Sequence, residues 1–136
     1  MDLLLLGLSH RTASVDDRGV AAAYVGADAE AWLTRAREAA RLAEVAVVAT
    51  CHRLEVYAVA SDPPAAEARL RHLFDDAHAE RMYARTSAGA ALHLARVHAR
   101  ALRYRKPQSA TEFGPYPSAT PPLATISLRI AIRGRS

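Results

Sequence analysis

The order in which strand-like and helix-like patterns alternate is the feature that most constrains how this chain folds. Runs of apolar or alternating residues predict strands at residues 3–8, 45–50 and 54–60, and a short extended piece at 81–85. Apolar residues recur at helical spacing over residues 29–43, 63–77 and 87–97. These elements all lie in the first 97 residues, which are therefore expected to form one domain.

Polar residues mark the beginnings of the predicted helices. Asp28 precedes the first helix, Ser61-Asp62-Pro63 the second, and Ser87 the third. A side-chain oxygen at such a position accepts hydrogen bonds from the first turn, and proline is tolerated at the first helical position. Residues 9–26 lack a comparable pattern, so we expect an irregular connection there with one helical turn near residues 15–22.

The resulting order, β-α-β-β-α-β followed by a helix, is typical of the split βαβ or ferredoxin-like arrangement. We therefore expect an α+β domain in which two helices cover one face of an antiparallel four-stranded sheet. The first and third strands are central neighbours in such a sheet. The loops that contain His10-Arg11 and Cys51-His52-Arg53 then lie either close together or at opposite edges, and both possibilities stay open.

The net charge is distributed unevenly along the chain. Residues 1–97 carry 11 Lys and Arg against 13 Asp and Glu, a net charge of −2, whereas residues 98–136 carry 7 against 1, a net charge of +6. The sequence pI of about 9.7 is therefore a property of the C-terminal part. Since 17 of the 18 basic residues are arginine, as a GC-rich genome produces, we do not read the pI as evidence of nucleic-acid binding.

The C-terminal part is rich in proline. Five prolines fall between Pro107 and Pro122, and they exclude a continuous helix or a central strand in this stretch. Residues 123–132 read as an isolated strand without an obvious partner. We expect a folded domain over residues 1–98 and a basic, disordered tail over residues 99–136.

Several classes of protein are excluded by what the sequence does not contain. No apolar run approaches the ~20 residues that cross a bilayer, and Met1-Asp2-Leu3 lacks the basic start of a signal peptide. The lone Cys51 excludes an intramolecular disulfide, a zinc ribbon and an iron–sulfur cluster, and the six histidines show no ligand spacing. We therefore expect a cytoplasmic protein with no metal and no membrane partner.

Cys51 is the residue with the clearest potential for chemistry. His52 and Arg53 follow it directly, and nearby cations lower the pKa of a thiol and favour the nucleophilic thiolate. A tight connection between two strands also places such a residue at the end of a sheet, where a substrate can reach it. The alternative is a buried small hydrophobe, which is common for a lone cysteine.

Two histidines allow a structural reading as well as a functional one. His10 follows the first predicted strand and belongs either to a site at the end of the sheet or to an ordinary polar loop. His93 lies on the apolar stripe of the third predicted helix, where a lone histidine is usually a core or boundary residue.

Two segments and a weaker third resemble the glutamyl-tRNA reductase family. Gly7-Leu8-Ser9-His10-Arg11-Thr12 resembles the opening signature of the family, and Thr50-Cys51-His52-Arg53-Leu54-Glu55 is similar to its active-site segment, Ser-Thr-Cys-Asn-Arg-Thr-Glu. Tyr83, followed ten residues later by His93-Leu94-Ala95-Arg96-Val97, is similar to its third block. The resemblance covers residues 3–97 and corresponds to the N-terminal catalytic domain of the family.

This resemblance implies an NADPH-dependent reduction of the glutamate on glutamyl-tRNA to glutamate-1-semialdehyde, the entry to tetrapyrrole (porphyrin) synthesis. Cys51 would be the nucleophile that forms a thioester, and His93 would support activity. Thr50, His52 and Arg53 would line the substrate pocket with Cys51, and Arg53 would bind the substrate carboxylate. The implied partners are glutamyl-tRNA and glutamate-1-semialdehyde aminomutase.

The sequence also departs from the family pattern. His52 and Leu54 stand where the family has Asn and Thr, and the motifs Ala-x-Gly-Leu-Asp-Ser and Gly-Glu-x-Gln are absent after Val97. No G-x-G-x-x-G fingerprint for a dinucleotide is present, and the NADPH and dimerisation domains of the family have no counterpart. We therefore expect a truncated chain, of the kind that a frameshift produces, which cannot transfer hydride by itself.

Two other functions remain open at this point. Split βαβ sheets often bind RNA by stacking bases on exposed aromatic residues, but only Tyr57 lies on a predicted central strand. The chain is alternatively an inactive remnant of a longer enzyme.

Overall fold

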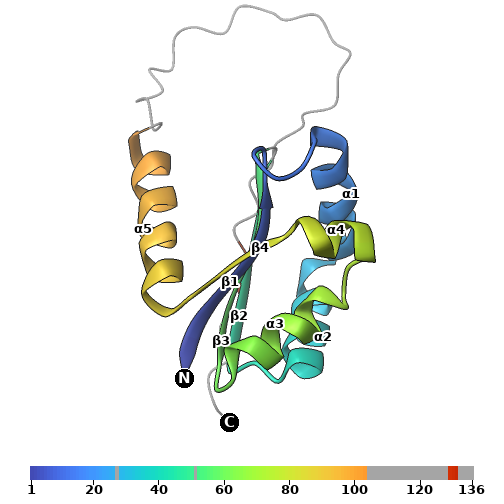
Figure 1. Cartoon of the computed structure of the whole chain (residues 1–136), viewed down its shortest axis with the longest axis vertical. Helices are drawn as coiled ribbons and strands as arrows, with labels where there is room; N and C mark the ends of the chain where they lie inside the picture. Colours follow the sequence, from blue (N-terminus) through green and yellow to red (C-terminus); the bar gives the residue numbers. More distant parts are fainter. Residues whose placement is uncertain (27, 51, 104–128, 132–136) are drawn as a thin grey trace, which may run out of the picture.

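The structure, a computed structural model, describes residues 1–26, 28–50, 52–103 and 129–131 of the 136-residue chain. Cys51 and the predicted tail segments 104–128 and 132–136 lie outside the described residues. The strands are β1 (Asp2–Ser9), β2 (Glu44–Thr50), β3 (Arg53–Ala60), β4 (Tyr83–Thr86) and β5 (Arg129–Ala131). The helices are α1 (Val15–Val25), α2 (Ala29–Ala40), α3 (Pro63–Arg71), α4 (Asp76–Arg81) and α5 (Ser87–Arg103) (Figure 1).

The sheet confirms the expected split βαβ arrangement. Its strand order is β4-β1-β3-β2-β5, and every neighbouring pair is antiparallel. In the central pair, Gly7 lies opposite Glu55 and Ser9 lies opposite Arg53. Just beyond this pair, the backbone N–H of His10 donates to the carbonyl oxygen of His52 at 3.0 Å. The two loops whose relative position the sequence left open therefore lie together at one end of the sheet.

The two faces of the sheet are covered unequally. Helices α1 to α4 pack on one face, and α5 stands alone against the other (Figure 1). Alternate residues of β1, among them Leu4, Leu6 and Leu8, point into the large core beneath α1 to α4. On the α5 face the fully buried apolar residues form a much smaller cluster of Leu5, Tyr57 and Ala90. This thinner layer leaves room for polar side chains between α5 and the sheet.

The connection after β1 is more regular than the sequence suggested. Residues 15–25 form the complete helix α1 rather than a single turn. Ser14 and Asp17 make a capping box: the Asp17 N–H donates to Oγ of Ser14 at 3.1 Å, and the Ser14 N–H donates to the Asp17 carboxylate at 3.2 Å. The buried residues Ala21 and Val25 then anchor the helix in the core, which explains why weak periodicity still gives a helix.

The helix predicted over residues 63–77 is instead two helices. α3 ends at Arg71, and Asp75 begins α4 by accepting a hydrogen bond from the backbone N–H of His78 at 2.9 Å. The Arg71 side chain spans the break and donates to the carbonyl oxygens of Ala79 and Met82. A second N-cap residue inside the apolar pattern is therefore what divides the helix.

The part of the described chain after β4 differs from expectation at two places: α5 begins at Ser87 as predicted but runs to Arg103 instead of ending at residue 97, and the tail strand is paired. Ser87 begins α5 with a left-handed φ of 49°, and its hydroxyl donates to the carboxylate of Asp2 at 3.1 Å. The tail strand was expected to lack a partner, but β5 pairs with β2. Without β5, β2 would be an edge strand with unpaired backbone groups, and β5 pairs with this edge. Within the described residues, no helix combines the length and apolarity that crossing a membrane requires.

Candidate functional site

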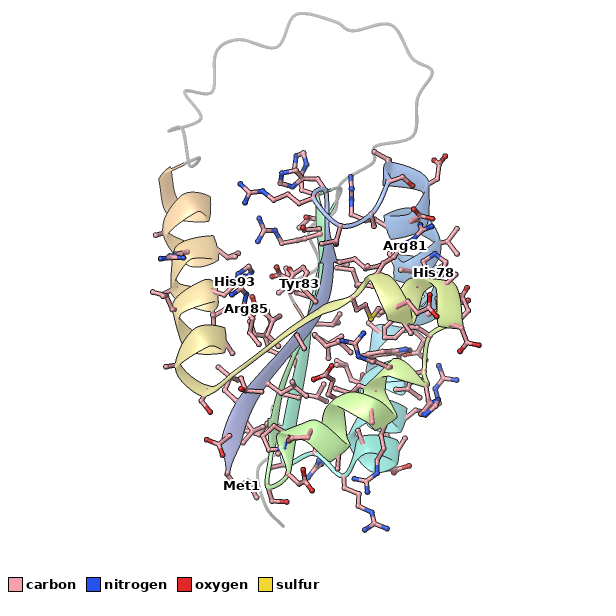
Figure 2. All side chains as sticks on the ribbon, viewed as in Figure 1. Met1, His78, Arg81, Tyr83, Arg85 and His93 are labelled. Atoms are coloured by element: carbon pink, nitrogen blue, oxygen red, sulfur yellow. The ribbon has the colours of Figure 1, made fainter. Side chains whose placement is uncertain are left out.

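A cavity of about 570 Å³ opens between α5 and the end of the sheet where the two loops meet. Its volume is typical of sites for small ligands, which span about 300–1,000 Å³. Figure 2 shows Tyr83 and Arg85 of β4 and His93 of α5 in the space between that helix and the sheet. The lining residues come from the strands β1, β3 and β4, the β1–α1 loop and α5: Ser9, His10, Arg11, Thr12, Arg53, Tyr83, Arg85, His93, Arg96, Val97 and Ala99.

Beside the cavity lies a buried carboxylate that is saturated with hydrogen bonds. Glu55 has an exposed fraction of 0%. Its Oε1 accepts from Tyr83 Oη at 2.6 Å, from His93 Nε2 at 2.7 Å and from Arg53 Nη1 at 3.2 Å. Its Oε2 accepts from Tyr57 Oη at 2.8 Å. Three elements, β3, β4 and α5, are therefore connected through one side chain.

The donors around Glu55 keep it ionised. Burial alone raises the pKa of a carboxyl group, but hydrogen bonds from Tyr83, Tyr57 and His93 and the charge of Arg53 outweigh it, so the pKa of Glu55 is lowered. Burial and the bond to this carboxylate raise the pKa values of Tyr57 and Tyr83. Both phenols therefore remain donors at neutral pH.

Gly7 makes room for this carboxylate. It lies opposite Glu55 in the β1–β3 pair. A Cβ atom built on Gly7 would lie 2.7 Å from the carbonyl oxygen of Leu54 and 2.9 Å from Cγ of Glu55. Both distances are shorter than a side chain tolerates, so this position requires glycine because of close approach rather than backbone conformation.

The cavity wall is strongly cationic. Arg11, Arg85 and Arg96 are exposed side chains of the wall, and none of them forms a salt bridge with another described residue. Glu55 contributes negative charge behind the wall, but its oxygens are already occupied by four donors. Such an arrangement favours an anionic ligand, because incoming negative charge meets cations that no described residue neutralises in a salt bridge.

Arg53 is prepared to bind a carboxylate. Its Nη1 is held by Glu55, while its Nε and Nη2 bond to none of the described residues. The side chain is 19% exposed and lines the cavity. A guanidinium group that is fixed at one nitrogen keeps its remaining N–H groups for a planar oxygen pair.

The other residues predicted for the substrate site lie near the cavity but not in its wall. Thr50 Oγ1 accepts a hydrogen bond from the backbone N–H of His52 at 3.2 Å, and the His52 ring lies edge-on to His10 with 6.2 Å between centroids. Neither Thr50 nor His52 lines the cavity among the described residues. Their role as substrate contacts stays a prediction, as does that of Cys51, which lies between them in sequence and outside the described residues.

Leu54, one of the departures from the family pattern, is a core residue and does not belong to the cavity wall. Its side chain is 1% exposed and belongs to the large core beneath α1 to α4. The cavity lies on the opposite face of β3, where Arg53 and Glu55 point. A change between Thr and Leu at this position therefore alters the core and not the cavity wall.

Sequence reasoning found His93 and Arg53 but gave no role to the residues that hold them. Glu55, Tyr57, Tyr83, Arg85 and Arg96 were not predicted as site residues. One signal was present: Glu55 and Tyr57 alternate along a strand predicted to be central, and Arg53, just before the predicted strand, continues the same spacing. A period of two places all three on one face, and a carboxylate on a central strand requires partners.

Comparison with known proteins supports a family for this chain. The family model described as "Glutamyl-tRNAGlu reductase, N-terminal domain" matches residues 6–100. A glutamyl-tRNA reductase of Xanthomonas campestris pv. campestris is 39% identical over 101 residues, which are 71% of this chain and 22% of the relative. One of Rippkaea orientalis is 44% identical over 62 residues, 46% of this chain and 14% of the relative.

A glutamyl-tRNA reductase of Desulfatibacillum aliphaticivorans is 35% identical over 74 residues, 54% of this chain and 17% of the relative. The chain thus spans less than a quarter of the length of each of these three relatives. The matched range of the family model contains every residue that lines the cavity. This chain belongs to the glutamyl-tRNA reductase family and corresponds to its N-terminal domain.

Proposed function

We propose that this domain captures the glutamyl group of glutamyl-tRNA and transfers it to Cys51 as a thioester. The observation that carries the proposal is the cavity, which is lined by His10-Arg11 of the first family-like segment, Arg53 of the second and His93 of the third. Segments far apart in the sequence thus supply one set of polar groups. The family match supports this assignment.

The cationic wall suits both ends of such a substrate. The N–H groups of Arg53 that bond to none of the described residues suit the glutamate carboxylate, which a guanidinium binds through two oxygens. Arg11, Arg85 and Arg96 suit the phosphates at the single-stranded 3′ end of a tRNA. A short anionic amino acid attached to a polyanion matches this distribution of charge.

The proposed reaction is an acyl transfer. Sγ of Cys51 forms a bond to the carbonyl carbon of the glutamyl ester, and the bond from that carbon to the terminal ribose oxygen of the tRNA breaks. The proton lost by the thiol ends on the ribose oxygen. His93 is the group in the cavity wall that is suited to carry it.

NADPH, which supplies hydride in the family, does not fit the described part of the chain. Dinucleotide sites use a parallel sheet with a glycine-rich turn between a strand and a helix. Here the strands pair antiparallel, and the strand-to-helix loop 10–14 contains no glycine. We therefore assign no hydride step to these residues and expect the thioester to persist or to be hydrolysed to glutamate.

The alternative of an RNA-stacking platform is disfavoured by one observation. Tyr57, the aromatic residue of the central strands, is 5% exposed and donates its hydroxyl hydrogen to Glu55. A buried ring cannot stack on a base. The α5 helix covers the sheet face that such a platform would need.

The direct test is mass spectrometry of the purified chain after incubation with glutamyl-tRNA. We expect a glutamyl adduct on Cys51, no adduct in Cys51→Ser, and slow glutamate release that depends on Cys51. Arg53→Ala is expected to raise the glutamyl-tRNA concentration that gives half-maximal acylation. Arg81→Ala is the matched control, because Arg81 pairs with Asp17 outside the cavity. An unmodified Cys51 in folded wild-type protein would favour the inactive remnant.

A further inference from the structure

We propose that Glu55 is a positioning residue that fixes His93 with its hydrogen on Nε2 and leaves Nδ1 as the basic nitrogen. The relationship that carries the proposal is the 2.7 Å contact between His93 Nε2 and Glu55 Oε1. Its importance for acyl transfer rests on the proposed function. The tautomer itself is a property of the free domain and is measured without substrate.

The tautomer follows from which partner is able to donate. An ionised carboxylate only accepts hydrogen bonds, so the hydrogen between the two groups belongs to Nε2 of His93. Neutral imidazole carries one ring hydrogen, and Nδ1 then keeps its lone pair. Since His93 lines the cavity, Nδ1 is the nitrogen available to take and return a proton there. A buried carboxylate orients catalytic histidines in other enzymes by the same logic.

The two oxygens of Glu55 have different tasks. Oε1 accepts from three residues that all line the cavity: Arg53, Tyr83 and His93. Oε2 accepts only from Tyr57 among the described residues, and Tyr57 does not line the cavity. Removing the Tyr57 hydroxyl therefore perturbs the same buried group on its structural side only. This asymmetry makes Tyr57→Phe a control matched to Glu55→Gln.

The groups around His93 show why Glu55 is the one to change. Glu55 and Arg53 face it from β3, Tyr83 and Arg85 from β4, and Arg96 belongs to its own helix. Glu55 is the only group in this set that accepts a hydrogen bond without being able to donate one. A glutamine side chain at this position offers both an acceptor oxygen and a donor N–H. In Glu55→Gln either ring nitrogen of His93 can therefore carry the hydrogen.

The decisive experiment is ¹⁵N NMR of the histidine side chains in the full chain near neutral pH. His93 is assigned by its absence in His93→Gln. In wild type and Tyr57→Phe we expect the Nε2–H tautomer, and in Glu55→Gln a mixture of tautomers. The proposal is overturned if wild-type His93 carries its hydrogen on Nδ1, or if Glu55→Gln has the same tautomer as wild type.

Acylation by glutamyl-tRNA gives the second readout. We expect Glu55→Gln to slow it roughly 100-fold, the size of a general acid–base contribution, and Tyr57→Phe to stay within about threefold. Equal slowing by both variants would show a merely structural role and overturn the proposal. If Glu55→Gln does not fold, the wild-type tautomer alone decides. Wild-type protein that is never acylated refutes the proposed function, whereas the tautomer result still stands.

Discussion

The side chain of Glu55 occupies the space where a side chain of Gly7 would begin. A Cβ atom on Gly7 would lie 2.9 Å from Cγ of Glu55, and the two residues are partners in the β1–β3 register. Gly7 belongs to the first family-like segment and Glu55 to the second. The two segments are thus linked by steric fit beneath the cavity, and not only by the loops that line it.

Gly7→Ala is therefore expected to destabilise the domain. The added methyl group meets the backbone oxygen of Leu54 at 2.7 Å, and backbone cannot move aside as a flexible side chain does. Overpacking of this kind costs roughly 1–3 kcal/mol. Urea denaturation followed by circular dichroism measures the change in the free energy of unfolding.

Gly19→Ala is the matched control for that substitution. Gly19 lies inside α1, and a Cβ built there meets no described atom within 4 Å apart from its chain neighbours and the backbone of its own helix. Alanine is expected to stabilise the domain by up to about 1 kcal/mol, because glycine disfavours helix interiors. Equal destabilisation by both substitutions would contradict the close packing between β1 and Glu55.

Glu55 is expected to make the stability of the domain pH-dependent. Its pKa is lowered in the folded state relative to the ordinary value of 4.5. The unfolded state therefore binds more protons, so this contribution is present above pH 4.5 and is lost as the pH falls through the folded pKa. Asp17 and Asp75, whose pKa values are also lowered, act in the same direction.

Glu55→Gln isolates the contribution of this group. Loss of hydrogen bonds to a buried charge is expected to reduce the free energy of unfolding by about 1.5–3 kcal/mol at neutral pH. The difference between wild type and variant should shrink on acidification below pH 4.5. Thermal denaturation across a pH series measures this difference in stability. A difference that grows in acid would be inconsistent with an ionised Glu55.

Charge reversal in the cavity wall is expected to weaken binding of RNA. Arg85→Glu and Arg96→Glu each remove one proposed phosphate contact, which lowers the slope of log K against log salt by about 0.7 for single-stranded RNA. Fluorescence anisotropy with a labelled acceptor-stem oligonucleotide measures this slope. Arg35→Glu is the control with the same change of net charge, because Arg35 is exposed on α2, on the opposite face of the sheet. If all three variants lower the slope equally, RNA binding depends on the net charge of the chain and not on the cavity wall.

The sequence predicted the strands well because their hydrophobic pattern is local to each strand. Apolar runs and alternation predicted four strands in the right order, since their pattern reflects burial on a sheet. The prediction was less accurate where one polar residue determines where a helix begins. Asp75 begins α4 and so divides the second predicted helix, and the capping box of Ser14 begins α1. Helix ends depend on a few hydrogen bonds that hydrophobic periodicity does not contain.

The site was harder to predict than the fold because it depends on long-range packing. Arg53 and His93 were found through resemblance, but their common partner is 38 residues from His93. No local pattern shows that Tyr83 and His93 meet the same oxygen of Glu55. The position of β5 had no signal either, since an edge strand accepts any extended partner with free backbone groups.

The cavity draws its walls from both ends of the described domain, which has a consequence for its biosynthesis. Residues 9–12 leave the ribosome early, whereas His93, Arg96 and Ala99 on the opposite wall are added some 80 residues later. The sheet face beneath α1 to α4 is complete with β4, but the nascent chain has no cavity until α5 has been made. Contacts of such sequence separation form late, because a long loop must close first. A partly synthesised chain that lacks α5 therefore carries the first two family-like segments but not the cavity.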